Sequence, residues 1–78
     1  MVRYFFDTDD GETARIDPDG MELDGPETAR SEALRSLADM ARDVLPVVDE
    51  RTFSTAVRPE DGTAIFRTSL TLKNEWLV

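Results

Sequence analysis

The chain has 78 residues, with 17 Asp and Glu against 9 Lys and Arg, and therefore a formal net charge of -8. This length accommodates one domain, so we expect a single α+β domain over residues 1–78. The lack of Cys excludes disulfides and thiolate metal sites, and the lack of His removes the side chain best suited to acid–base chemistry near neutrality. We therefore expect no metal and no cofactor, and self-association is the most plausible added support for so small a core.

The negative charge is concentrated in the N-terminal third of the chain. Residues 1–27 hold nine acids and two bases. Such a surface repels phosphate backbones and anionic lipids, so we expect no direct nucleic-acid binding and no membrane binding. No apolar stretch approaches the roughly 20 residues that cross a bilayer. The first residues also lack the apolar segment of a secretory signal, and the sequence favours a cytoplasmic protein.

The first third of the chain predicts a β-hairpin followed by a short extended segment. The aromatic run at residues 3–6 favours a strand, with Tyr4 and Phe6 on one face. Asp10-Gly11 is a tight-turn signal, and residues 13–16 follow as the second strand. After a turn at residues 17–20, residues 21–23 are expected to be extended.

A helix is predicted from about Pro26 to Val44 or Leu45. Proline suits the first helical position, which makes Gly25 the expected N-cap. Pro46 ends the helix because proline disfavours helical geometry at the preceding residue. Apolar residues recur at spacings of three and four and predict one buried stripe, namely Leu34, Leu37, Ala41 and Val44, widened by Ala33, Ala38 and Leu45.

The last third of the chain predicts a second hairpin. Residues 52–57 alternate, with Phe53, Thr55 and Val57 on one face, and residues 63–72 alternate again after a turn at residues 58–62. The order of elements is therefore β-β-α-β-β. The simplest packing places one amphipathic helix on one face of a four-stranded antiparallel sheet.

Several short motifs occur along the chain in a suggestive order: Tyr4-Phe5-Phe6-Asp7, Gly11, Asp17 with Asp19-Gly20, Glu32-Ala33, and Val57-Arg58 with Asp61-Gly62. In this order they resemble a family of small alphaproteobacterial proteins classed as a domain of unknown function. The resemblance covers nearly the whole chain and implies a bacterial cytoplasmic protein. It implies no activity and no site residues.

A looser resemblance is carried by Tyr4-Phe5-Phe6, Asp10-Gly11 and Glu32-Ala33. These motifs follow the outline of the HicB-type antitoxin domain, which implies an acidic protein that masks a basic partner. The long second hairpin over residues 53–72 departs from that outline. A fold-level likeness of this kind carries little information about function.

The acidic cluster at residues 7–12 is the one candidate for cation chemistry. Hard cations need several converging oxygen ligands, but the spacing around Gly11 and Gly20 fails the calcium-loop pattern. A solvated turn is the expected role, with weak divalent-cation binding or an enzymatic role as the alternative. The chain has no His to activate its Ser residues and only Lys73 as an amine base, so we expect no enzyme and no catalytic residue.

The aromatic residues are too many for one sheet face to bury. We therefore predict an interaction surface that includes Phe5, Ile65, Trp76 and Leu77, because aromatic side chains dominate binding hot spots. The alternatives are ordinary surface apolarity and, for Trp76, closure of the core. Open sheet edges also invite strand addition by a partner. The predicted function is that of a small acidic non-enzymatic protein, a protein-interaction or self-association module whose partner is another protein or a second copy in a homodimer.

Overall fold

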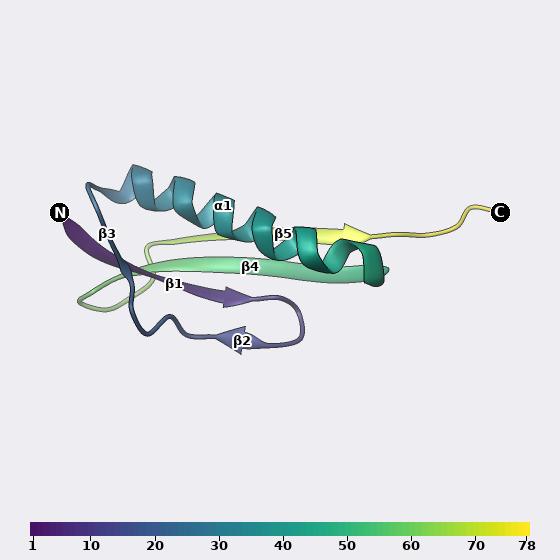
Figure 1. The fold of residues 1–78 in the computed structure, drawn as a ribbon, viewed down its shortest axis with the longest axis horizontal. Helices are drawn as coiled ribbons and strands as arrows, with labels where there is room; N and C mark the ends of the chain where they lie inside the picture. Colours follow the sequence, from purple (N-terminus) through teal and green to yellow (C-terminus); the bar gives the residue numbers. More distant parts are fainter.

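In the computed structural model, which describes residues 1–78, one helix lies across one face of an antiparallel sheet (Figure 1). Helix α1 spans Pro26–Val44, begins after Gly25 and is followed by a 3₁₀ turn, η1, at Leu45–Val47. The strands are β1 (Val2–Asp9), β2 (Ala14–Arg15), β3 (Met21–Leu23), β4 (Glu50–Pro59) and β5 (Phe66–Lys73). The α+β class, the helix bounds and both predicted hairpins are confirmed.

The sheet has five strands but is four strands wide. Its order is β2-β1-β4-β5, and β3 also pairs with β1, on the same side as β2. β2 lies against the end of β1, where Thr8 faces Arg15, and β3 lies against its beginning, where Tyr4 faces Met21. The predicted β-β-α-β-β order fits this sheet, and the segment expected to be extended at residues 21–23 adds the short β3, because three extended residues do not reveal that they pair with a distant strand.

The core lies between α1 and the sheet in two clusters along the helix. The cluster near the start of α1 contains Tyr4, Ala29, Ala33 and Val57. The second cluster contains Leu37, Ala41 and Phe53. Thr55 lies between them on β4, fully buried, and its hydroxyl has no hydrogen-bond partner. The predicted inward face of β4 is confirmed.

The buried stripe of α1 differs from the predicted one. The buried residues are Ala29, Ala33, Leu37 and Ala41. Leu34 and Leu45 are exposed instead, and so is Ala38. Small alanine side chains let the helix backbone approach the sheet closely, so the larger side chains fall on the flanks of the contact. The prediction gave more weight to the larger hydrophobic residues. The predicted buried stripe was therefore rotated around the helix axis relative to the observed one.

Candidate interaction surface

β5 is an open edge of the sheet. It pairs with β4 from Glu50–Lys73 to Val57–Phe66 and has no neighbour on its other side. Just beyond β5, the N–H of Asn74 donates to the carbonyl of Asp49 at 2.6 Å. Backbone groups alternate along an antiparallel strand, so the odd-numbered residues of β5 direct their N–H and C=O groups away from β4. This edge is therefore a regular row of unpaired donors and acceptors.

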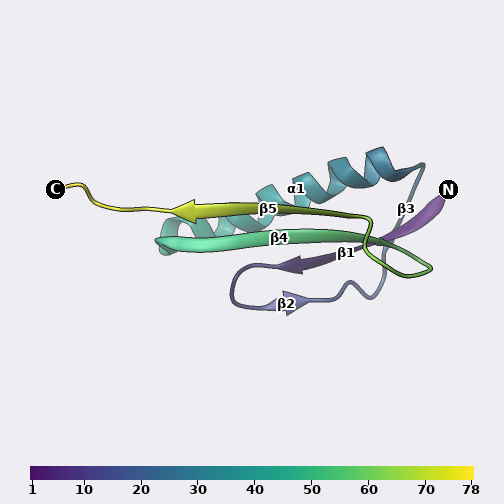
Figure 2. The ribbon, with the colours of Figure 1, turned by 180° about the vertical axis from the view of Figure 1, so that it is seen from behind.

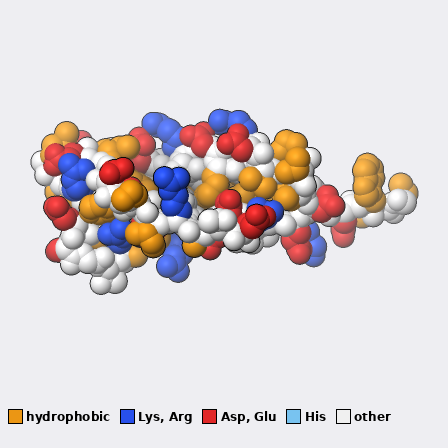
Figure 3. Space-filling model, turned by 60° about the horizontal axis from the view of Figure 1, so that its bottom comes forward, with side chains coloured by type: hydrophobic (Ala, Val, Ile, Leu, Met, Phe, Trp, Pro, Cys, Tyr) orange, Lys and Arg blue, Asp and Glu red, His pale blue; other side chains and the backbone are white.

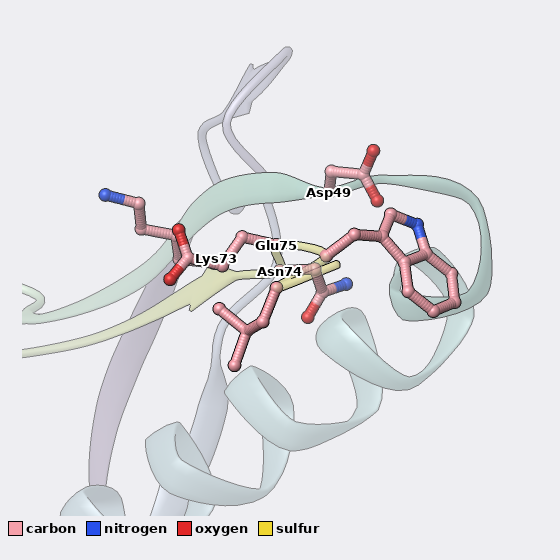
Figure 4. A pocket seen from close by; sticks show the side chains of 6 residues that line it. Asp49, Lys73, Asn74 and Glu75 are labelled. Carbon is pink, nitrogen blue, oxygen red and sulfur yellow. The ribbon is translucent and has the colours of Figure 1, made fainter.

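Residues 74–78 leave the sheet as an extended tail beyond β5 (Figures 1 and 2). Trp76 is 93% exposed and Leu77 is 85% exposed, and the end of the tail stands clear of the body (Figure 3). An open hollow of about 520 Å³ lies at the base of the tail, with Asp49 and Asn74 on its wall (Figure 4). The tail thus presents apolar side chains that no part of its own chain covers.

The structure separates the four predicted surface residues within one chain. Ile65 is exposed and directly precedes β5, whereas Trp76 and Leu77 follow its other end. At about 3.3 Å per residue, Ile65 and Trp76 lie roughly 35 Å apart. Phe5 lies on the helix-free face of the sheet and is half-buried. The guanidinium of Arg58 stands 4.6 Å from the centre of its ring, so Phe5 packs within the chain.

Two leucines at the β5 edge were not among the predicted surface residues. Leu70 on β5 is 44% exposed and Leu34 on α1 is 39% exposed. Arg30, one helical turn before Leu34, lies over the ring of Phe66, 5.9 Å from its centre, so this side of α1 overhangs β5. Both leucines therefore lie on the helix side of the sheet, Leu70 on β5 and Leu34 on the side of α1 that overhangs it, and we call this pair of exposed residues the apolar margin. The periodicity of the sequence predicts that each leucine lies on the apolar face of its own element. It does not show which of these residues lie at the open edge of the sheet.

The opposite edge of the sheet is closed by a side chain. β2 and β3 leave a gap beside the middle of β1, and the N–H of Phe6 points into it. The carboxylate of Asp17 accepts this N–H at 3.1 Å and those of Asp19 and Gly20 at 3.0 and 3.2 Å. A carboxylate therefore supplies the acceptor that a paired strand would provide.

A second carboxylate fixes the same turn to the sheet. Asp7 accepts the N–H of Asp17 at 2.9 Å and the Nε of Arg58 at 2.7 Å. Arg58 also donates to the carbonyl of Asp17 at 3.2 Å and covers Phe5. Charge-assisted hydrogen bonds of this length are the stronger kind. Asp7, Asp17 and Arg58, which belong to the motifs shared with the family of unknown function, thus have a structural role in holding the turn to the sheet.

Two carboxyl groups in this region have lowered pKa values. Partial burial of Asp17 opposes its ionisation, but the N–H donors of Phe6, Gly20 and Asp19, together with nearby Arg58, outweigh burial and lower its pKa. The pKa of Asp10 is lowered mainly by the N–H groups of Thr13 and Glu12, at 2.7 and 2.9 Å. Both carboxylates therefore favour the folded state when they are charged.

The acidic turn at residues 7–12 does not gather its carboxylates around one point. Asp9 accepts the N–H of Gly11 at 2.8 Å, and Glu12 lies 3.6 Å from the guanidinium of Arg51. Arg51 also donates to the carbonyl of Asp10 at 3.1 Å. No group of three or more acidic side chains is placed to hold a metal ion. The alternative of a cation site gains no support from this geometry.

Gly20 is the point where the turn at residues 17–20 touches β1, and it gives a direct test of that contact. Its φ is +71°, and a Cβ there would lie 2.9 Å from the carbonyl oxygen of Tyr4 and 2.9 Å from the ring of Phe5. We expect Gly20→Ala to lower the free energy of unfolding by about 1–3 kcal/mol, measured by urea denaturation. Gly25→Ala is the control, because Gly25 has an extended backbone and nothing within 4 Å. Equal losses in the two variants would contradict the contact.

Comparisons with known proteins identify the domain. A family model described as a domain of unknown function (DUF6894) matches residues 3–71, which run from β1 almost to the end of β5. Neither the curated proteins nor the solved structures gave a match, so no relative supports the HicB-type likeness. None of the helices has the length and apolar character that a membrane span requires. The predicted resemblance to a family of unknown function is confirmed, and the chain belongs to the DUF6894 family.

Proposed function

We propose that the chain is a non-enzymatic protein-interaction module that self-associates through the open β5 edge and the C-terminal tail. The observation that carries this proposal is the exposure of Trp76 and Leu77, 93% and 85%, just beyond a strand whose outer edge is unpaired. Tryptophan is among the residues most enriched at the centres of interfaces. A partner that covered this tail would remove its apolar surface from water and complete the hydrogen bonds of β5.

The distribution of charge favours a second copy as the partner. The acidic residues 1–27 form β1 and the edge opposite β5, whereas residues 51–78 hold four bases and three acids. Two chains can therefore join at β5 without bringing their acidic surfaces together. The acidic surface also disfavours nucleic acid as a ligand. We place the module in the cytoplasm, as expected from the sequence.

Trp76→Ala tests the role of the tail. We expect the full chain to sediment as a dimer at micromolar concentration. The dissociation constant of the variant dimer should be about tenfold higher or more. Its circular dichroism should match the wild type, because Trp76 contributes to no core cluster. Ile16→Ala is the control, since Ile16 is exposed beside β2 on the opposite edge.

Two further results bear on the proposal. The melting temperature of the wild type should rise with protein concentration, as it does when association stabilises the fold. A chain that sediments as a monomer at every concentration would overturn self-association. A dimer that Trp76→Ala leaves unchanged would show that the tail lies outside the interface.

A further inference from the structure

We infer that two copies join β5 to β5 in a single antiparallel register, with Thr71 opposite the partner's Thr71 on the two-fold axis. This inference rests on the proposed self-association and specifies its geometry. The two sheets then become one continuous sheet with both helices on the same face. The unpaired tail of each chain lies beside the first residues of the partner's β5.

Backbone hydrogen bonding limits the possible registers. The odd-numbered residues of β5 direct their N–H and C=O groups to the open edge, as the bond from Asn74 to Asp49 indicates. An antiparallel pair must place odd-numbered residues opposite odd-numbered residues. The two-fold axis between the strands therefore lies where one residue faces its own copy, and not midway between two successive residues. An axis near the centre of the strand pairs the most residues, and the central candidates in β5 and its tail are Ser69, Leu70, Thr71 and Leu72.

The side chains favour Thr71 among these four. With the axis there, Arg67 faces the partner's Glu75, which pairs opposite charges. Phe66 faces the partner's Trp76, which pairs an aromatic with an aromatic. The partner's Leu77 lies just beyond this pair, next to Ile65, whose N–H donates to the carbonyl of Val57 at 2.8 Å and not to the open edge. Such cross-strand pairs are the favourable units of antiparallel sheets. The register therefore places Glu75 and Trp76 of the tail opposite matching side chains.

The other registers lack this match. An axis at Leu70 places Arg67 opposite the partner's Lys73, and like charges directly opposite are destabilising. An axis at Leu72 places Leu77 opposite the partner's Arg67. An axis at Ser69 carries Leu77 past the start of the partner's β5 to the turn at residues 59–62, where no strand can pair with it. Each of these registers therefore brings two cations together, places an apolar tail residue against a charge, or leaves it without a paired strand.

The Thr71 register also covers the apolar margin formed by Leu34 and Leu70. Leu70 faces the partner's Leu72, on the helix side of the sheet, because Phe66, Leu70 and Leu72 share the face that α1 covers. The partner's Trp76 enters on this same face, beside Phe66 and the overhanging Arg30. The register thus unites Ile65 and Trp76, which are far apart within one chain, in one interface.

Cysteine cross-linking tests the register, because the natural chain has no Cys. Single variants Ser69→Cys, Leu70→Cys, Thr71→Cys and Leu72→Cys are oxidised in the full chain, and the rate of covalent dimer formation is measured. Disulfides form over Cα distances of about 4.4–6.8 Å, a range met by a residue on the axis facing its own copy. We expect Thr71→Cys to cross-link fastest.

A charge exchange gives an independent readout in sedimentation. Arg67→Glu and Glu75→Arg should each raise the dissociation constant of the dimer about three- to tenfold. The double variant should return this constant to within about twofold of the wild-type value. Arg15→Glu changes the net charge equally at the opposite edge and should have no effect.

The outcomes separate the register from self-association. A sedimenting dimer with fastest cross-linking at another position, or a double charge variant that is not restored, would overturn the register and leave self-association standing. A monomer with uniformly slow cross-linking at all four positions would overturn both.

Discussion

Phe53→Ala is expected to remove about a quarter or more of the domain's free energy of unfolding. Phe53 is fully buried and packs with Leu37 and Ala41 beneath the second half of α1. Removing a buried Phe side chain costs about 3–5 kcal/mol, through lost burial and the cavity that remains. At about 0.05–0.15 kcal/mol per residue, the whole domain has roughly 4–12 kcal/mol of stability. Urea denaturation followed by circular dichroism measures the loss.

A matched valine pair controls for the effect of truncation itself. Val57→Ala removes the same atoms from the fully buried first cluster as Val47→Ala removes from the exposed 3₁₀ turn. We expect Val57→Ala to cost about 1.5–3 kcal/mol and Val47→Ala to be nearly neutral. Similar losses at the two valine positions, or a loss in Phe53→Ala well below about 3 kcal/mol, would contradict the assignment of the core.

Asp17→Ala has the second largest expected effect, a loss of about 2–4 kcal/mol. The substitution leaves the N–H groups of Phe6, Asp19 and Gly20 without their acceptor, and hydrogen bonds to charged groups are worth about 1.5–3 kcal/mol. Asp19→Ala is the control in the same turn, because Asp19 is exposed. A loss no greater than that of the control would show that Asp17 does not hold the turn.

The same site gives a pH dependence with a definite sign. The pKa of Asp17 is lower in the folded chain than its ordinary value, so the folded state binds fewer protons. Its stabilising contribution is complete above the unfolded pKa of about 3.9 and is lost as the pH falls through the lower folded pKa. Asp10 contributes with the same sign. We expect the acid limb of the stability curve to be shallower in Asp17→Asn than in the wild type.

The elements that depend on local spacing were predicted well from the sequence. Pro26 and Pro46 bracket the helix because proline acts on its own residue and its neighbour. The alternation of residues 63–72 predicted a strand with two distinct faces, and β5 confirms it, because side-chain direction follows from strand geometry. These signals act over a few residues and need no knowledge of the rest of the fold.

Features that depend on distant contacts were not predictable in this way. The pairing of β3 with β1 and the use of Asp17 as a strand-like acceptor both require knowing what lies beside Phe6. The exposure of Leu34 depends on how closely the alanines of α1 approach the sheet. For the surface, the sequence indicated Trp76 and Leu77 but did not separate closure of the core from an interface. The role of these residues in binding stays a prediction.

The carboxylate that fills the gap between β2 and β3 has a consequence for how large an assembly can become. A sheet with two open edges adds copies without limit and grows into a fibre, whereas a sheet with one usable edge stops at a pair. The short strands and the anchored turn at Asp17 make the second edge unfit for another strand. If two copies join at β5 as proposed, the pair has no second edge that fits a further copy, and weakening Asp17 would favour growth beyond two copies.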